Sequence, residues 1–203
     1  MREISAESVA QGHVHHHDHD HGHDCVWDEH IWLSPKNAIA CVRAIAQNLS
    51  ECREAAASDF AKNAESYVSA LTDLDARYTE TVAQASAPRL LFADRFPFIY
   101  LTEDYGIEYL AAFEGCSTES GATAQTMARL AQRINDWQLS YVCITETANR
   151  ALAESVIRNT QSKQQTIVTL HAMQSVTAKQ IESGFSYLTA MEQNLSVLRQ
   201  ILL

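Results

Sequence analysis

Residues 28–35 read DEHIWLSP, and this stretch marks the point at which an ordered fold is predicted to begin. Ser34 is a preferred N-cap and Pro35 suits the first helical position, so the sequence predicts a helix from Pro35 onward. Apolar residues then recur at helical spacing as far as Leu49. His30 stands just before this helix start, where the helix can hold it in a fixed place.

A histidine-rich tract precedes this stretch, between residues 13 and 23, with Asp18 and Asp20 inside it. Its seven histidines are His13, His15, His16, His17, His19, His21 and His23. Neutral imidazole is the commonest protein ligand for Zn²⁺, and it also binds Ni²⁺, Co²⁺ and Cu²⁺. The alternative is a purification tag, but such tags are usually unbroken runs. A native metal-binding tract of low specificity is therefore favoured.

The overall composition is that of a globular protein. Of 203 residues, 46% are hydrophobic, and residues 1–30 carry −6 of the net charge of −10, with seven acidic residues and one basic residue. No basic stripe for nucleic acid is present. The five cysteines form no C-x-x-C pair, which argues against a zinc ribbon. The first residues lack the apolar region of a signal peptide, and no apolar run suits a membrane span, so we expect a soluble chain without an export signal.

Helical and strand-like segments alternate beyond the first helix. A helix without Gly or Pro is predicted at 58–85, ~40 Å long at ~1.5 Å per residue. Further helices are predicted at 96–105, 122–137, 149–159 and from 177 towards 203, and strands at 89–92, 107–113, 141–145 and 166–171. This order predicts an α/β fold, a parallel sheet flanked by helices. Ligands of such sheets bind beyond the carboxyl ends of the strands.

Five segments carry a family resemblance when they are taken together. They are residues 28–38 (DEHIWLSPKNA), 90–98 (LLFADRFPF), 104–106 (DYG), 112–117 (AFEGCS) and 173–177 (MQSVT). The combination resembles the cluster A-I solute-binding proteins, the zinc and manganese receptors of ABC uptake systems. The resemblance implies two α/β lobes joined by a long backbone helix, with one metal ion between them. Many zinc-specific members carry an acidic, His-rich loop just before the second metal ligand, as this chain does.

The resemblance also implies a division of the chain into four parts. Residues 1–26 form a disordered, acidic, His-rich metal-binding segment, and residues 27–57 a remnant of the N-terminal lobe. Residues 58–85 form the backbone linker helix and residues 86–203 the C-terminal α/β lobe. Members of the family are roughly a lobe longer at the N-terminus. We therefore expect most of the first lobe to be missing here, together with the first metal-binding histidine.

A partial metal site follows from the same resemblance. His30 matches the second ligand of the family. The third ligand comes after the strand that ends at Phe92 and is histidine in typical zinc receptors; here the neighbourhood offers Ala93 and Asp94, so Asp94 is the candidate and the register stays open. The fourth ligand is an acidic residue after the next strand of the cleft, and Glu146 fits best. One histidine and two carboxylates would suit Zn²⁺ or Mn²⁺.

Each of these candidates also has a structural interpretation. His30 could be an ordinary interfacial histidine beside an aromatic ring. Asp94 could pair with Arg95 or cap the following helix, and Glu146 could be a cap or a surface acid. His171 ends a predicted strand, and a satisfied histidine at the rim of the core is favoured over a ligand.

The sequence favours a metal-binding protein that captures Zn²⁺ outside the cytoplasm, in the periplasm or at the cell surface. Its partner would be the ABC permease subunit in the membrane, with Mn²⁺ or another divalent transition metal as alternative cargo. The alternative function is a truncated, stand-alone zinc buffer that binds only through the tract. No enzyme is expected, because no H-E-x-x-H, G-x-S-x-G or phosphate-loop motif occurs.

Overall fold

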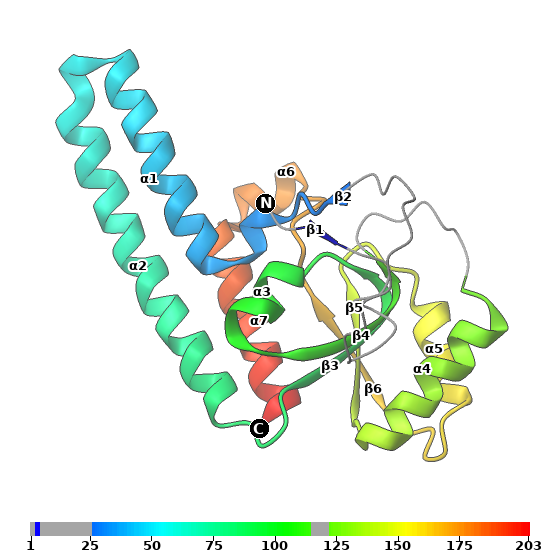
Figure 1. Ribbon diagram of the computed structural model, residues 1–203. Helices are drawn as coiled ribbons and strands as arrows, with labels where there is room; N and C mark the ends of the chain where they lie inside the picture. The colour runs from blue at the N-terminus through cyan, green and yellow to red at the C-terminus, as the bar shows by residue number, and fades with distance from the viewer. Residues whose placement is uncertain (1–2, 5–25, 115–121) are drawn as a thin grey trace, which may run out of the picture.

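The computed structural model describes residues 3–4, 26–114 and 122–203 of the chain. Their central element is a four-stranded parallel sheet in the order β4-β3-β5-β6 (Figure 1). The strands are β3 (Arg89–Phe96), β4 (Glu108–Glu114), β5 (Tyr141–Thr145) and β6 (Thr166–Leu170). The predicted α/β class with a parallel sheet is therefore confirmed.

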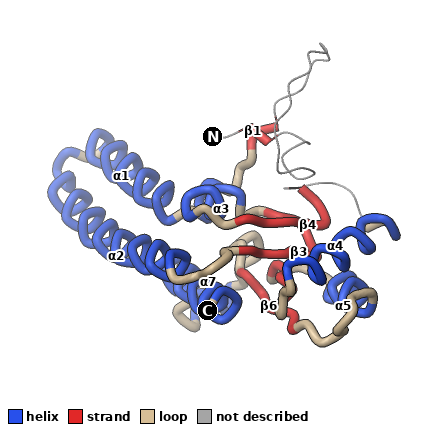
Figure 2. The backbone as a smooth tube through the Cα atoms, turned by 60° about the horizontal axis from the view of Figure 1, so that its bottom comes forward, coloured by secondary structure: helices blue, strands red, loops and turns tan. Residues whose placement is uncertain are grey.

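Helices cover both faces of this sheet (Figure 2). On one face lie α2 (Ala57–Ala83), α3 (Ile99–Tyr105) and α7 (Tyr187–Leu202), and on the other lie α4 (Ala124–Trp137) and α5 (Arg150–Arg158). Each face has its own core. All four strands run in one direction, so their carboxyl ends meet at a single edge, where the loops to the following helices begin.

Strand β3 shows how the sequence builds these two cores. Successive side chains of a strand point to opposite faces of the sheet. Leu90 and Phe92 pack with α2, α3 and α7, whereas Leu91 and Ala93 pack with α4 and α5. All four are at most 1% exposed, which explains the unbroken apolar run of a strand buried on both faces. Burial of a Leu or Phe side chain stabilises the fold by about 1.5–3 kcal/mol.

Helix α1 (Pro35–Cys52) begins as the sequence predicted. The Ser34 Oγ accepts a hydrogen bond from the backbone N–H of Asn37 at 3.1 Å, and Pro35 occupies the first turn. A short 3₁₀ turn, η2 (Glu54–Ala56), then reverses the chain into α2, so that α1 and α2 form a long helical hairpin (Figure 1).

The C-terminal half of α2 anchors this hairpin to the sheet. Leu74 and Tyr78 are at most 1% exposed within the core that α2 shares with α7. The hydroxyl of Tyr78 donates a hydrogen bond to the backbone carbonyl of Met191 at 2.7 Å, and the Tyr78 ring stacks on that of Tyr105. Burial raises the pKa of the Tyr78 hydroxyl well above its ordinary value, so it remains a hydrogen-bond donor.

Three predicted elements were wrong in their extent. The strand expected at 89–92 continues to Phe96, and the helix expected at 96–105 therefore begins only at Ile99. Pro97 explains the difference, since a residue that precedes proline is biased towards extended backbone. The single helix expected from residue 177 onward is two helices, α6 (Ala178–Glu182) and α7.

Gly184 causes the break between α6 and α7. Its φ of +88° lies in the left-handed region that favours glycine, which turns the chain out of the helix. Ser186 then starts α7 with a capping box of its own, in which Thr189 is the partner.

Near the N-terminus, β1 (Glu3–Ile4) pairs antiparallel with β2 (Val26–Trp27). Glu3, Ile4 and Val26 belong to these two strands, although they lie within the segment 1–26 that the sequence analysis expected to be disordered. The histidine tract lies outside the described residues. The four-part division of the chain remains a prediction. Within the part of the chain that the structure describes, no helix is both long and apolar enough to cross a bilayer.

The contact between α2 and α7 gives a stability prediction. We expect Tyr78→Phe to lower the free energy of unfolding by about 1 kcal/mol, because it removes one buried hydrogen bond and leaves the ring in place. Urea denaturation followed by circular dichroism measures the change. Tyr141→Phe is the matched control, since no other described residue bonds its hydroxyl. Equal stability of the Tyr78→Phe variant and the parent would contradict the assignment.

Candidate metal centre

The segment from Asp28 to His30 links strand β2 to the short helix η1 (Ile31–Leu33), which leads directly into α1. Backbone hydrogen bonds from Ile31 to Glu29 and from Leu33 to His30 tighten the segment into a turn. The hydroxyl of Tyr100 in α3 donates to the carbonyl of Asp28 at 2.8 Å. The turn and the contact with Tyr100 therefore fix the segment that carries His30, as the position of this histidine next to the helix start suggested.

A single carboxylate oxygen sets the orientation of His30. Oδ1 of Asp28 accepts a hydrogen bond from the backbone N–H of His30 at 2.8 Å and lies 3.0 Å from the ring Nδ1. A carboxylate can only accept, so Nδ1 of a neutral imidazole carries the proton and Nε2 keeps its lone pair. Asp28 is 2% exposed and His30 is 1% exposed. The ring is therefore held in the tautomer that binds a metal through Nε2.

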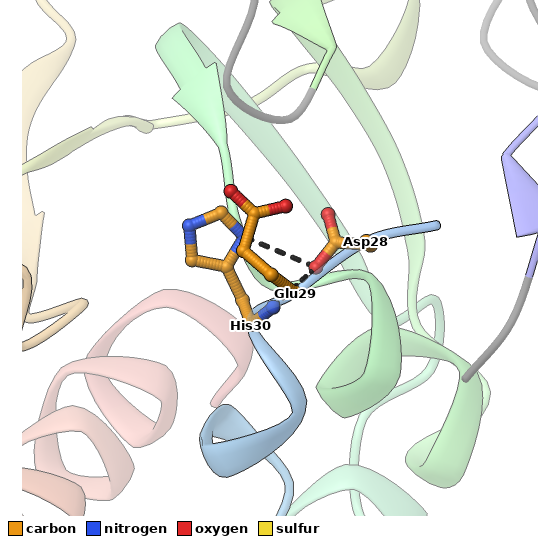
Figure 3. Close-up of side chains that lie close together, drawn as sticks. All are labelled: Asp28, Glu29 and His30. Atoms are coloured by element: carbon orange, nitrogen blue, oxygen red, sulfur yellow. Dashed lines mark hydrogen bonds and ion pairs between the residues drawn. The ribbon is translucent and has the colours of Figure 1, made fainter. Parts of the chain in front are cut away.

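Asp28, Glu29 and His30 form the group of three potential ligands that the described residues bring together. One ligand atom from each lies within 4.8 Å of the others. In Figure 3 the Glu29 carboxylate lies above the dashed contact that joins the imidazole to the Asp28 carboxylate. Glu29 is exposed, whereas Asp28 Oδ2 is buried and has no hydrogen-bond partner among the described residues. A buried carboxylate oxygen without a partner favours a positive charge nearby.

The other ring nitrogen of His30 faces a residue far away in the sequence. The side-chain Nε2 of Gln174 lies 2.6 Å from His30 Nε2. The indole N–H of Trp32 also donates to the carbonyl of Ala172 at 3.0 Å. The loop between β6 and α6 is thus docked against the turn that carries His30.

Glu146 holds this loop in place. Its Oε2 accepts a hydrogen bond from the backbone N–H of Ala172 at 2.8 Å, and its Oε1 accepts one from that of Gln174 at 3.1 Å. Met173, between them, has a positive φ of 58°, so the chain turns sharply and both N–H groups reach one carboxylate. Glu146 is neither a helix cap nor a surface acid, because Asn149 caps α5 and the Glu146 side chain is only 13% exposed.

His171 lies at the rim of the core, as the sequence analysis favoured. Its Nδ1 accepts a hydrogen bond from the backbone N–H of Met173 at 2.9 Å and lies 3.5 Å from Glu146 Oε1. Its backbone exchanges two hydrogen bonds with the side-chain amide of Asn194. These bonds join the end of β6 to α7 and support the same loop.

Asp94 occupies an irregularity of β3, where the register with β4 shifts between Phe92 and Arg95. Its Oδ2 accepts hydrogen bonds from the backbone N–H and the hydroxyl of Thr145, at the end of β5. Helix α3 begins without a side-chain cap, so the capping interpretation of Asp94 is wrong. Ala93 is 1% exposed and faces the core beneath α4 and α5.

The structure therefore separates the three predicted cleft ligands. His30 belongs to the three-residue group, whereas Asp94 and Glu146 lie outside it and bind Thr145 and the loop 171–174. Their role as ligands remains a prediction. The seven tract histidines lie outside the described residues. Asp28 could have been found from its position two residues before His30. Gln174 lies in the segment 173–177 that contributes to the family resemblance, but the sequence analysis did not single it out.

Comparison with known proteins identifies one family. The family model described as zinc-uptake complex component A, periplasmic (ZnuA), matches residues 2–201. The zinc-binding lipoprotein AdcA of Streptococcus pneumoniae strain R6 is 34% identical over 176 residues, which is 86% of this chain and 34% of the relative. The high-affinity zinc uptake system protein ZnuA of Bacillus subtilis strain 168 is 26% identical over 176 residues, which is 87% of this chain and 54% of that protein.

A solved structure supports the same relationship. The crystal structure of the Zn(II)-bound ZnuA-like domain of Streptococcus pneumoniae AdcA superposes with a TM-score of 0.71 at 30% identity. The match covers 87% of this chain and 64% of that domain. The chain thus spans about a third of the length of the streptococcal AdcA proteins and about two thirds of the solved domain.

The support that Glu146 gives to the loop can be measured without metal. We expect Glu146→Ala to accelerate hydrogen exchange of the Ala172 and Gln174 amides by about 10- to 100-fold, because a hydrogen bond to a charged group contributes about 1.5–3 kcal/mol. Exchange followed by NMR measures both amides. Glu192→Ala, which removes an exposed carboxylate from α7, should leave them unchanged. Unaltered exchange in the Glu146→Ala variant would show that the carboxylate does not hold the loop.

Proposed function

The chain belongs to the family of periplasmic zinc-uptake component A proteins, and from this premise we propose that it binds Zn²⁺ outside the cytoplasm for delivery to an ABC permease in the membrane. The family is one of solute-binding proteins rather than enzymes. The observation that carries the proposal is the geometry of His30. Its imidazole is buried, its Nδ1 is held by a carboxylate, and its Nε2 is turned towards the loop after β6.

This geometry suits a transition-metal ligand for two reasons. A metal-bound histidine commonly donates its second ring N–H to a carboxylate, which fixes the ring and makes the ligating nitrogen more basic. In this chain Asp28 supplies the carboxylate that accepts the hydrogen bond from His30. In addition, a cation on the imidazole would offset the charge of the buried Asp28 carboxylate, one oxygen of which has no hydrogen-bond partner among the described residues.

Zinc is the proposed cargo because of the donor set and the relatives. Nitrogen from imidazole and oxygen from carboxylate are common ligands of Zn²⁺. Glu29 is the carboxylate closest in sequence to His30 and belongs to the same group. The relatives that match most of this chain are named as zinc-binding or zinc-uptake proteins. Asp94 and Glu146 are retained as predicted ligands of the same site.

The histidine tract is proposed as a second, less specific site for the same cargo. Strands β1 and β2 pair its flanking residues, and β2 runs directly into Asp28. Metal captured by His13–His23 would then be held at high local concentration beside His30, because both ends of the connecting segment are tethered there. A chain that bound metal only through the tract would instead act as a buffer.

Calorimetric titration with Zn²⁺ distinguishes a zinc-delivery protein with a site at His30 from a buffer that binds zinc only through the tract. We expect the variant lacking residues 13–23 to keep one stoichiometric site, and His30→Ala in that background to weaken it by about 100-fold or more, since even residues that only support a metal ligand contribute about 10- to 100-fold. Far-ultraviolet circular dichroism of both variants checks that the fold is retained. If the variant without the tract binds no zinc, the proposal fails and the buffer function replaces it.

A further inference from the structure

We propose that Gln174 caps the metal-binding nitrogen of His30 in the metal-free chain and thereby limits its affinity for the cation. The inference rests on the proposed function, because it concerns the same imidazole. It begins from the 2.6 Å contact between Gln174 Nε2 and His30 Nε2. In this form the lone pair needed by a metal is already engaged in a hydrogen bond.

The direction of that hydrogen bond follows from the other side of the ring. Asp28 Oδ1 lies 3.0 Å from Nδ1 of His30 and can only accept, so Nδ1 is the donor nitrogen of the neutral ring. His30 Nε2 is then the acceptor, and the side-chain NH₂ of Gln174 is its donor. A metal ion and this NH₂ therefore compete for one lone pair.

The backbone of Gln174 is held by the loop, whereas its side chain is held through its contact with His30. Glu146 binds the N–H groups of Ala172 and Gln174, and Trp32 binds the carbonyl of Ala172. Gln174 itself is exposed. The last torsion of a glutamine side chain is broad and roughly two-fold, so the amide can rotate without displacing the loop. Rotation removes the NH₂ from His30 and presents the neutral Oε1 instead.

The chemistry of this cap explains why it lowers affinity. Metal binding must first break the bond between Gln174 and His30, and the amide oxygen that can replace it carries no charge. A carboxylate at this position would have no proton to donate to Nε2 and would offer an anionic oxygen to the cation. Gln174 is thus an affinity-determining residue whose effect depends on His30.

The test is Gln174→Glu in the chain that lacks residues 13–23, titrated with Zn²⁺ by competition against a chelating dye. We expect the dissociation constant to fall by about tenfold or more, equivalent to about 1.4 kcal/mol. Gln132→Glu makes the same charge change on the exposed part of α4 and should leave the dissociation constant unchanged. Equal or weaker binding by the Gln174→Glu variant overturns the proposal, whereas absence of binding by the parent overturns the proposed function instead.

Nitrogen NMR of the metal-free chain tests the cap independently of zinc affinity. We expect the ¹⁵N resonance of His30 Nε2 to be that of an unprotonated, hydrogen-bonded nitrogen, and to shift when Gln174→Leu removes the donor. The side-chain amide protons of Gln174 should shift in turn in the His30→Ala variant. An unchanged Nε2 resonance in the Gln174→Leu variant would show that no cap exists, even if zinc binds to the parent.

Discussion

The candidate centre depends on one buried carboxylate oxygen. Asp28 Oδ1 is in hydrogen-bond contact with both the backbone N–H and the ring Nδ1 of His30, so it sets where the residue lies and which ring nitrogen keeps a lone pair. The cost of burying this charge is offset only in part, because Asp28 Oδ2 has no hydrogen-bond partner among the described residues. A cation beside the imidazole would offset the remaining cost of burying the Asp28 carboxylate. The electrostatics of the turn are in this way linked to metal binding.

The loop after β6 forms the other side of the environment of the His30 imidazole. Strand β6 ends at a loop that Glu146 binds through two backbone N–H groups, and Glu146 itself follows strand β5. Because β5 and β6 are parallel, Glu146 and the loop after β6 lie at the same edge of the sheet. Trp32 links the loop to the turn that carries His30. The long hairpin of α1 and α2 then ties that turn to the core through Tyr78 and Met191.

Two of the predicted ligands, Asp94 and Glu146, lie outside the group of potential ligands in this structure and bind neighbouring segments of the chain. Asp94 connects β3 to the end of β5, and Glu146 positions Gln174, which in turn contacts His30. Carboxylates at the ends of parallel strands can serve as metal ligands or as anchors for the adjoining loops. The local sequence does not distinguish these two roles. In this structure the loop that turns at Met173, with its positive φ, directs two backbone N–H groups to Glu146, so this carboxylate acts as an anchor here, and its role as a ligand stays a prediction.

The sequence by itself determined the class of fold, most of its elements and the place of His30, because hydrophobic periodicity and helix caps are local properties. It misplaced the start of α3 and joined α6 to α7, where Pro97 and Gly184 acted against an otherwise continuous pattern. Only the tertiary structure decided that Gln174 meets His30, 144 residues away. Contacts between distant loops arise from sheet order and loop geometry, and these properties leave no periodic trace in the chain.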